Sequence, residues 1–348
     1  LIKSFFYLRF LILYFVIKYL LRQNKINLKI FFFSASFCSL FVCLDLIFQL
    51  IYGFDIFGYK STGRRLSGPF GDELIAGSYL QRFSLFLIFI IPLFYKTKNN
   101  KLFIITLSLI ITLIIFSLII AGNRMPLTLF LSILFLILIL ERNVRKLIIP
   151  FILISSAVTL ITYNYNSNVK DHFNHYNKKI SEFIIFLSTI YSEKSSKIKN
   201  SHVINLNGKQ IQIPNTYIKE FNSGYQTWLK NKYVGDGIKS FKKNCKKTNV
   251  HNCGPHPHNY YLEIMANLGL VGLILMSFIF FTLIYNSFIK KYFLNSNLKY
   301  NHIITPFIFL FLAEIFPIRT TGSFFTTGNA TYFFLVMAIT IALSKKEI

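Results

Sequence analysis

Apolar residues form long runs along the chain, separated by short polar turns. Four runs approach or exceed the roughly 20 apolar residues that let a helix cross a bilayer. They are Ile30–Tyr52, Leu74–Tyr95, Leu102–Ala121 and Tyr260–Tyr285. Shorter runs lie at 4–21, 126–140, 147–163, 302–318 and 329–343. The pattern predicts an all-α polytopic membrane protein with about nine transmembrane helices and one large extracytoplasmic loop insert.

Three consecutive segments follow from this pattern. Residues 1–163 would hold about six transmembrane helices, and residues 258–348 about three more. Residues 164–257 would form the extracytoplasmic loop. The first residue is Leu, and Arg9 and Lys18 interrupt the first apolar run. We therefore expect further spans to precede this chain.

Composition supports lipid as the main surrounding solvent, since 53% of the 348 residues are hydrophobic and 40 are Phe. The net charge of +25 would suggest nucleic acid in a soluble protein. Here the basic residues gather in short turns between apolar runs, so we expect no nucleic-acid partner. These turns hold Lys96, Lys98 and Lys101, then Arg142, Arg145 and Lys146, then Lys290, Lys291 and Lys299, with Lys345 and Lys346 in the tail.

Placing the basic turns in the cytoplasm gives an alternation of spans without conflict, as the positive-inside rule requires. Four stretches then lie outside: Phe54–Asp72, Gly122–Arg124, Asn164–Pro257 and Arg319–Gly328. The sequence thus predicts a multi-pass membrane protein whose long loop lies on the non-cytoplasmic side of the membrane.

The loop insert is too long to be a simple connector. Short strands are predicted at Val203–Leu206 and Gln210–Ile213, around the turn residues Asn207-Gly208. Apolar residues at helical spacing then predict an amphipathic helix from Tyr217, with Gly235 and Gly237 breaking it. Trp228 would lie either at the membrane interface or against a small core of the loop.

Two of the four cysteines, Cys245 and Cys253, lie in the predicted loop. An oxidising compartment would permit a disulfide between them. Zinc is the alternative, because His251, His256 and His258 are close in sequence. The Cys-x7-Cys spacing fits no common zinc pattern, which favours the disulfide. Both cysteines are therefore predicted to be structural.

The densest chemical signal is the run from His256 to Glu263, at the point where the loop enters a span. Pro257 disfavours helix at His256, so the helix is expected to begin near His258 or Asn259. Gly269 and Gly272 follow within the apolar run, where small residues would let another helix approach closely.

His258-Asn259, nine residues and then Gly269-x-x-Gly272 resemble the signature of the O-antigen ligase and polymerase superfamily. Ser67–Glu73, Ala121–Arg124 and Gly235–Phe241 are similar to the family in the same order, so the likeness covers about residues 60–280. The resemblance implies a catalytic His and a glycosyltransferase that takes a glycan from a polyprenyl-diphosphate carrier. The acceptor would be lipid A core or another glycan. Leu273 and Ile274 stand where small hydroxyl residues are frequent in the family, a departure that argues against a ligase in particular. Ligase and polymerase share the motif, so both stay open.

The residues support the same chemistry independently of the resemblance. A histidine ordinarily titrates near pH 6.5, so neutral His258 could accept the proton of an acceptor hydroxyl. Arg124 lies in a predicted outer turn, and a guanidinium suits phosphate oxygens. Further substrate-binding candidates are Arg64, Arg65, Arg319, Asn259 and His256. A cap at a helix start for His258, and contact with lipid headgroups for Arg124, are the structural alternatives.

Acidic residues in apolar runs leave a second class of function open. Glu314 could orient Arg319 or Arg124, and Asp45 could pair with Lys18 or Arg9, or either could relay protons in a transporter. A transporter or flippase of lipid-linked glycans is the main alternative, and a structural scaffold is a weaker one. The sequence has no Asp-x-Asp pair, no phosphate-binding Gly-rich loop with Lys-Ser or Lys-Thr and no Gly-x-Ser-x-Gly. We therefore expect neither a metal nor any other cofactor.

Overall fold

The structure is a computed structural model of the 348-residue chain. It describes residues 2–60, 65–94, 100–141, 154, 156–164, 167, 169–171, 173–175, 177–178, 181, 202–206, 209–213, 216–248, 253–294, 303–320 and 322–344.

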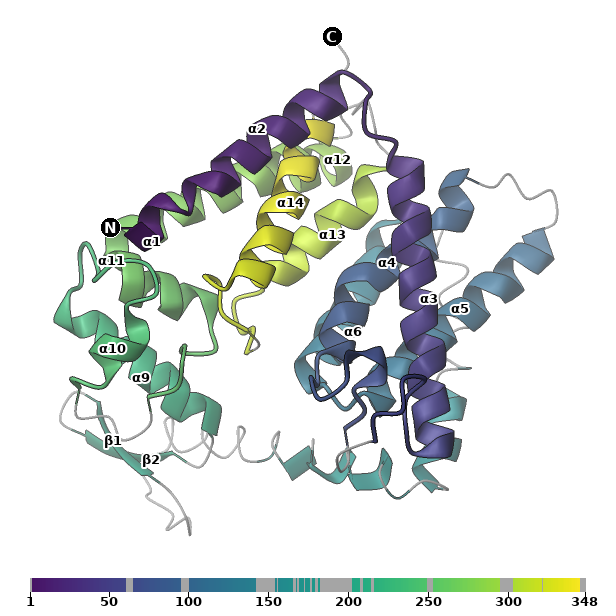
Figure 1. The fold of residues 1–348 in the computed structure, drawn as a ribbon, viewed down its shortest axis with the longest axis horizontal. Helices are drawn as coiled ribbons and strands as arrows, with labels where there is room; N and C mark the ends of the chain where they lie inside the picture. The colour runs from purple at the N-terminus through teal and green to yellow at the C-terminus, as the bar shows by residue number, and fades with distance from the viewer. Residues whose placement is uncertain are drawn as a thin grey trace. The chain divides into compact units, whose positions relative to one another are not determined.

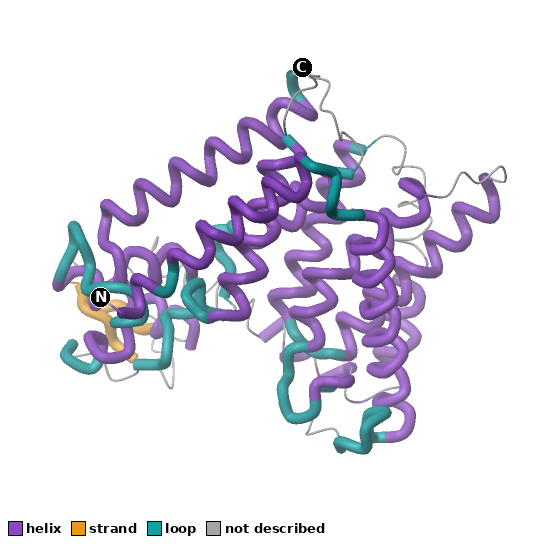
Figure 2. The backbone as a smooth tube through the Cα atoms, turned by 45° about the horizontal axis from the view of Figure 1, so that its top comes forward, coloured by secondary structure: helices purple, strands orange, loops and turns teal. Residues whose placement is uncertain are grey.

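The described chain is mostly helical, with one antiparallel β-hairpin (Figures 1 and 2). Its N-terminal part contains α1 (Ile2–Phe5), α2 (Leu8–Arg22), α3 (Leu28–Tyr52), η1 (Gly68–Phe70), α4 (Ala76–Phe94), α5 (Asn100–Ile120) and α6 (Arg124–Leu140). Then come β1 (His202–Leu206), β2 (Lys209–Ile213), α9 (Thr216–Lys230) and α10 (Phe241–Cys245). The C-terminal part contains α11 (Tyr260–Ile284), the π-helical η2 (Tyr285–Ile289), α12 (Lys290–Tyr292), α13 (Ile304–Glu314) and α14 (Thr327–Leu343).

Two described helical stretches are long and apolar enough to cross a membrane. They are α3 and the continuous stretch Tyr260–Tyr292, which comprises α11, η2 and α12. Shorter apolar helices lie at Ala76–Ile90, Ile105–Ile120, Arg124–Leu140, Ile304–Glu314 and Thr327–Leu343. The helical fold class agrees with the sequence, and the two long stretches indicate membrane association. The nine-span topology stays a prediction.

The chain divides into two compact units, which are described separately. Unit 1 comprises Leu1–Val16, Asn174–Ile284 and Ile315–Leu335. Unit 2 comprises Ile17–Phe173, Tyr285–Glu314 and Val336–Ile348. Because the units group residues by contact, they cut across the three consecutive segments proposed from the sequence.

Unit 2 is built around α3, α4, α5 and α6, which pack side by side, with α13 against α4 and α6 (Figure 1). Asn27 begins α3 by accepting a hydrogen bond from the backbone N–H of Lys29. Gly53 ends the helix in the left-handed conformation, with φ of 82°. Phe rings from α3, α4 and α13 form an aromatic cluster with centroids 5.0–6.0 Å apart, namely Phe31, Phe32, Phe86 and Phe307.

Unit 1 gathers α9 and α10 against α11 (Figure 1). Its aromatic contacts link α11 to the segment that follows residue 315, through the rings of Tyr260, Phe280, Phe324 and Phe333. Apolar burial of this kind is the main force that holds these segments together.

The loop insert contains the two predicted strands. β1 and β2 pair in antiparallel register, with His202 opposite Ile213 and Leu206 opposite Lys209. The predicted amphipathic helix is present as α9, and it ends at Lys230 before the loop that contains Gly235 and Gly237. The Nε1–H of Trp228 donates to the backbone oxygen of Lys232, 3.0 Å away, and so helps to end the helix.

Candidate active site

His258 lies in unit 1, where the loop enters α11. Its φ of 52° is in the left-handed region, which non-glycine residues adopt uncommonly, although His, Asn and Asp do so more often than the rest. Pro257, buried just before it, packs on α9. A Cβ at Gly224 of α9 would come within 2.8 Å of the Pro257 Cβ, so the glycine permits this close approach. The turn thus fixes the direction from which His258 projects.

Within the part of the chain that the structure describes, Glu220 and His256 lie against His258. Glu220 of α9 places Oε1 3.6 Å from Nε2 of His258, and the His256 ring centroid is 4.2 Å from the His258 ring centroid. Burial raises the pKa of the Glu220 carboxyl, and His258 acts in the opposite direction. Burial, followed by the effect of His258, lowers the pKa of His256 to about 4. His256 is therefore neutral at physiological pH.

Polar atoms beside His258 are left unsatisfied. Among the described residues, Nε2 of His256 and Oε2 of Glu220 are buried without a hydrogen-bond partner. Buried polar atoms in native proteins are nearly always paired, so such exceptions call for an explanation. A bound water or a polar ligand would each supply the missing partners.

Asn259 caps α11 and ties it to the segment around Arg319. Its side-chain oxygen accepts hydrogen bonds from the backbone N–H groups of Tyr261 and Leu262. Its side-chain nitrogen donates to the backbone oxygens of Pro317 and Arg319, at 2.8 and 3.4 Å. The helix begins at Tyr260, as Pro257 led us to expect. These contacts give the Asn259 amide a structural role, and its contact with substrate stays a prediction.

Arg319 is the most deeply buried of the described candidate arginines, with 3% of its surface exposed. Its guanidinium carbon lies 5.0 Å from the centroid of the Tyr260 ring, a distance typical of a cation–π contact. The Asn259 contacts hold the backbone of Arg319 beside the start of α11. Unit 1 therefore contains His256 and His258 in ring contact, and Asn259, the residue after His258, ties the backbone of Arg319 to the start of α11.

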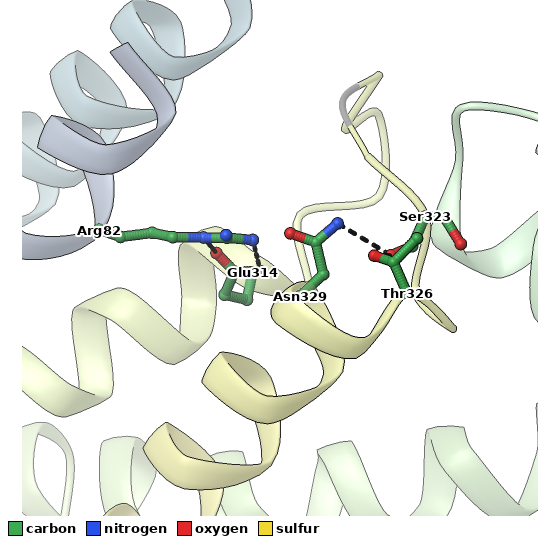
Figure 3. Close-up of polar contacts among 5 residues, drawn as sticks. All are labelled: Arg82, Glu314, Ser323, Thr326 and Asn329. Atoms are coloured by element: carbon green, nitrogen blue, oxygen red, sulfur yellow. Dashed lines mark hydrogen bonds and ion pairs between the residues drawn. The ribbon is translucent and has the colours of Figure 1, made fainter. Parts of the chain in front are cut away.

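Glu263, one turn further along α11, orders the loop before α14. The carboxylate accepts hydrogen bonds from the Ser323 hydroxyl at 2.5 Å and from the Phe324 N–H at 2.6 Å. The Asn329 amide then donates to the backbone oxygen of Ser323 at 3.0 Å (Figure 3). No role was predicted for this glutamate from the sequence.

α11 is interrupted at Gly269, where φ and ψ are 66° and −166°. The interruption frees backbone N–H groups, and the loop after α9 satisfies them. Leu270 donates to the Lys232 oxygen at 2.8 Å and Val271 to the Tyr233 oxygen at 3.1 Å. A Cβ at Gly269 would lie 2.2 Å from the Tyr233 oxygen. The close approach predicted at this glycine thus comes from a loop rather than from another helix. A Cβ at Gly272 would instead meet Leu268 of α11 itself, at 2.2 Å.

The resemblance motif Gly235–Phe241 packs on the same interruption. The Gly237 N–H donates to the Asn267 oxygen at 2.8 Å. The side-chain oxygen of Asn267 accepts from the N–H groups of Ser240 and Phe241, at 2.9 and 3.2 Å, at the start of α10. α10 ends at Cys245, whose disulfide with Cys253 is present as the sequence favoured. The disulfide connects α10 to the turn that carries His256 and His258.

Substituting Gly269 by alanine should destabilise the protein by about 1–3 kcal/mol from backbone strain alone, because this φ and ψ combination is essentially restricted to glycine. The Cβ would also displace the Tyr233 backbone. Thermal unfolding of the purified protein in detergent would measure the loss. Gly237→Ala is the matched control, since its φ is also positive, at 94°, but a Cβ there meets nothing within 4 Å. An equal loss in both variants would show that strain, rather than the loop contact, sets the cost.

The other two motifs of the resemblance, Ser67–Glu73 and Ala121–Arg124, lie in unit 2. In the first of them, the Gly68 N–H donates to Oε1 of Gln49 at 2.9 Å. Near the second, Nδ2 of Asn123 donates to the Leu74 oxygen at 2.9 Å, and a Cβ at Gly77 would meet Asn123 at 2.7 Å. These contacts hold the turn before α6 against the start of α4.

Arg124 is the first residue of α6, immediately after this turn, and its side chain is partly buried. Arg65 is also partly buried. Arg64 lies outside the described residues. Arg65 and Arg124 belong to unit 2, whereas His256, His258 and Arg319 belong to unit 1.

A buried ion pair in unit 2 was not anticipated. Arg82 of α4 donates to Glu314 at the end of α13 through two nitrogens, Nε to Oε1 at 2.9 Å and Nη2 to Oε2 at 3.3 Å (Figure 3). Glu314 thus has Arg82 as a partner, which the sequence did not suggest, and its predicted role in orienting Arg319 or Arg124 stays a prediction. Oδ1 of Asp45 accepts from the Ile56 N–H at 2.7 Å.

Glu220, Glu263 and Arg82 are the functional candidates that sequence reasoning missed. A charged residue within a largely apolar run was the available signal for Glu263 and Arg82. Glu220 gave none, because it lies in a polar segment. Among the residues that the structure describes, no three His, Cys, Asp or Glu side chains cluster closely enough to hold a metal ion.

The fold and site define a mostly helical protein with candidate membrane spans and a histidine–carboxylate pair beside a helix start. No family model matches the chain, and no curated protein matches it in sequence.

Proposed function

We propose that this protein is a membrane glycosyltransferase that moves a glycan from a polyprenyl-diphosphate carrier to an acceptor hydroxyl, as an O-antigen ligase or polymerase does. The observation that carries the proposal is His258 in its left-handed turn, paired with Glu220 and next to unsatisfied polar atoms. A base held by a carboxylate and beside unfilled hydrogen-bonding positions is suited to act on a hydroxyl group.

In the proposed reaction, the acceptor oxygen attacks the anomeric carbon of the donor glycan. His258 takes the hydroxyl proton, the bond between the anomeric carbon and the phosphate oxygen breaks, and polyprenyl diphosphate leaves with the electron pair. Direct displacement inverts the anomeric centre. Arg124 would bind the diphosphate, since a guanidinium stabilises charge on phosphate oxygens. Arg319, Arg65 and Arg64 would assist it, and the reaction needs no metal.

The proposal places the protein as a multi-pass protein in the bacterial inner membrane with its loop in the periplasm, and contacts between turns support the predicted alternation of spans. Asn123 and Leu74 are in contact near predicted outer ends of spans, and so are Asn259 and Arg319. At predicted inner ends, Nζ of Lys291 lies 3.1 Å from Oε1 of Glu141. In each case the contact joins segments that the positive-inside rule places on the same side.

A transporter or flippase of lipid-linked glycans is the second candidate. The observation that favours it is the interruption of α11 at Gly269, since broken helices line the substrate sites of many transporters. A transporter would need arginines for the diphosphate but no base at His258.

The test is glycan transfer in membranes that contain the protein, supplied with a polyprenyl diphosphate carrying a labelled oligosaccharide and with a glycan or lipid A core acceptor. We expect a product with inverted anomeric configuration, and at least a tenfold lower rate in Arg124→Ala, because the variant lacks the proposed diphosphate clamp. Arg22→Ala, on the predicted inner side, is the matched control. Movement of the donor across the membrane without any transfer product would favour the transporter, and a product of retained configuration would exclude direct displacement.

A further inference from the structure

Glu220 and His258 come from different elements that meet at one point. Glu220 lies in the second turn of α9, and His258 lies two residues before α11. α9 packs against α11 and approaches the Pro257 turn at Gly224, one helical turn after Glu220. Residues four apart share a helix face, so the face of α9 that packs on the turn also presents the carboxylate to the imidazole.

The Glu220 carboxylate makes fewer hydrogen bonds than a purely structural carboxylate would. Its Oε2 is buried with no hydrogen-bond partner among the described residues, while Oε1 faces Nε2 of His258 at 3.6 Å. A structural carboxylate would be expected to have its oxygens paired. Contacts between catalytic groups are often long before substrate binds and shorten in the reacting complex.

We propose that Glu220 is the positioning residue of His258: its carboxylate holds the proton on Nε2, which leaves Nδ1 as the nitrogen that takes the proton of the acceptor hydroxyl. This inference rests on the proposed function of His258 as the base. It assigns to Glu220 the choice of tautomer and the stabilisation of the imidazolium that forms during transfer.

The surrounding charges fit this role. His256, whose ring lies against His258, is kept neutral by its low pKa of about 4, so it adds no positive charge beside the imidazolium. The backbone oxygen of Arg319 accepts from Asn259, and its guanidinium lies over the Tyr260 ring. Glu220 is thus the acidic group, among the described contacts of His258, that can balance the charge.

The experiment compares wild type with Glu220→Gln, which keeps the size of the side chain but removes its charge. We expect the transfer rate to fall at least tenfold at neutral pH, as is typical of losing the group that orients a general base. The acidic limb of the pH–rate profile should also move to lower pH, because the imidazolium that forms during transfer would lack a nearby negative charge. The rate would be measured from pH 5 to pH 9.

Three further variants separate the outcomes. Glu220→Asp should recover part of the rate, and Asp171→Asn, an exposed acid of the loop insert, should match wild type in rate and profile. If His258→Asn abolishes transfer while Glu220→Gln keeps the wild-type rate and profile, the role of Glu220 is overturned and the proposed function stands. If His258→Asn keeps full transfer, the base itself is misassigned. A rate loss in Glu220→Gln with an unchanged profile would show that the carboxylate only supports the fold.

Discussion

Replacing His258 by asparagine should lower the rate of glycan transfer by about 10²–10⁴-fold, the usual contribution of a general base. Asparagine is chosen because it tolerates the left-handed conformation that His258 adopts, with φ of 52°, and because it cannot accept the proton. The loss should appear at every pH, since the group that titrates has been removed. Binding of the lipid-linked donor should change little, because the proposed diphosphate contacts come from arginines.

The measurement is single-turnover transfer in membranes at matched expression, with donor binding recorded in parallel. His175→Asn, a histidine in the same loop insert, controls for the substitution itself. His258→Ala adds a useful comparison, because alanine in a left-handed turn also strains the backbone. If the alanine variant loses both donor binding and thermal stability while the asparagine variant transfers normally, His258 is a turn residue rather than a base.

Much of the fold can be predicted from local patterns in the sequence. The apolar runs predicted the helices, Asn207-Gly208 predicted the hairpin of β1 and β2, and Pro257 predicted where α11 begins. These features depend on residues that are close in sequence, so local spacing and backbone chemistry are enough to predict them. The Cys245–Cys253 disulfide is of the same kind, since it closes a short loop.

The partners of the charged side chains could not be predicted in the same way. Glu314 pairs with Arg82, which is 232 residues away in sequence, and Asp45 binds a backbone N–H. Glu220 reaches His258 because Gly224 lets α9 approach Pro257. Such contacts depend on how helices pack in space, and no spacing rule encodes that packing. The reason for Gly269 was likewise hidden, because the element that approaches it is an irregular loop.

The contacts that packing creates also divide the proposed reaction between the two units. Under the proposed function, unit 1 would supply the base with its carboxylate, and unit 2 would supply Arg124 on a turn fixed by Asn123. Each half of the chemistry thus rests on contacts within its own unit. A variant in unit 2 can therefore weaken diphosphate binding without disturbing the His258 turn, which makes binding and proton transfer separable by mutation.

Replacing Glu314 by glutamine should destabilise the protein by about 3–5 kcal/mol, the typical cost of removing one partner of a buried ion pair. The Glu314 side chain is fully buried and that of Arg82 is 13% exposed, so water can hydrate the guanidinium only slightly. Glutamine keeps the size of the side chain, and the loss would therefore report the charge rather than a cavity.

Thermal unfolding in detergent would measure this loss, which should lower the apparent Tm by about 5–10 °C. Glu73→Gln, an exposed acid, is the control and should leave the Tm unchanged. The double variant Arg82→Met with Glu314→Leu should recover most of the stability, because replacing a buried ion pair by apolar side chains is often neutral. If the single variant unfolds at the wild-type temperature, α4 and α13 are held together by their apolar contacts and the pair is free to serve another purpose. If the double variant is stable but transfers no glycan, the buried charges are needed for the reaction. They would then not be needed for the fold.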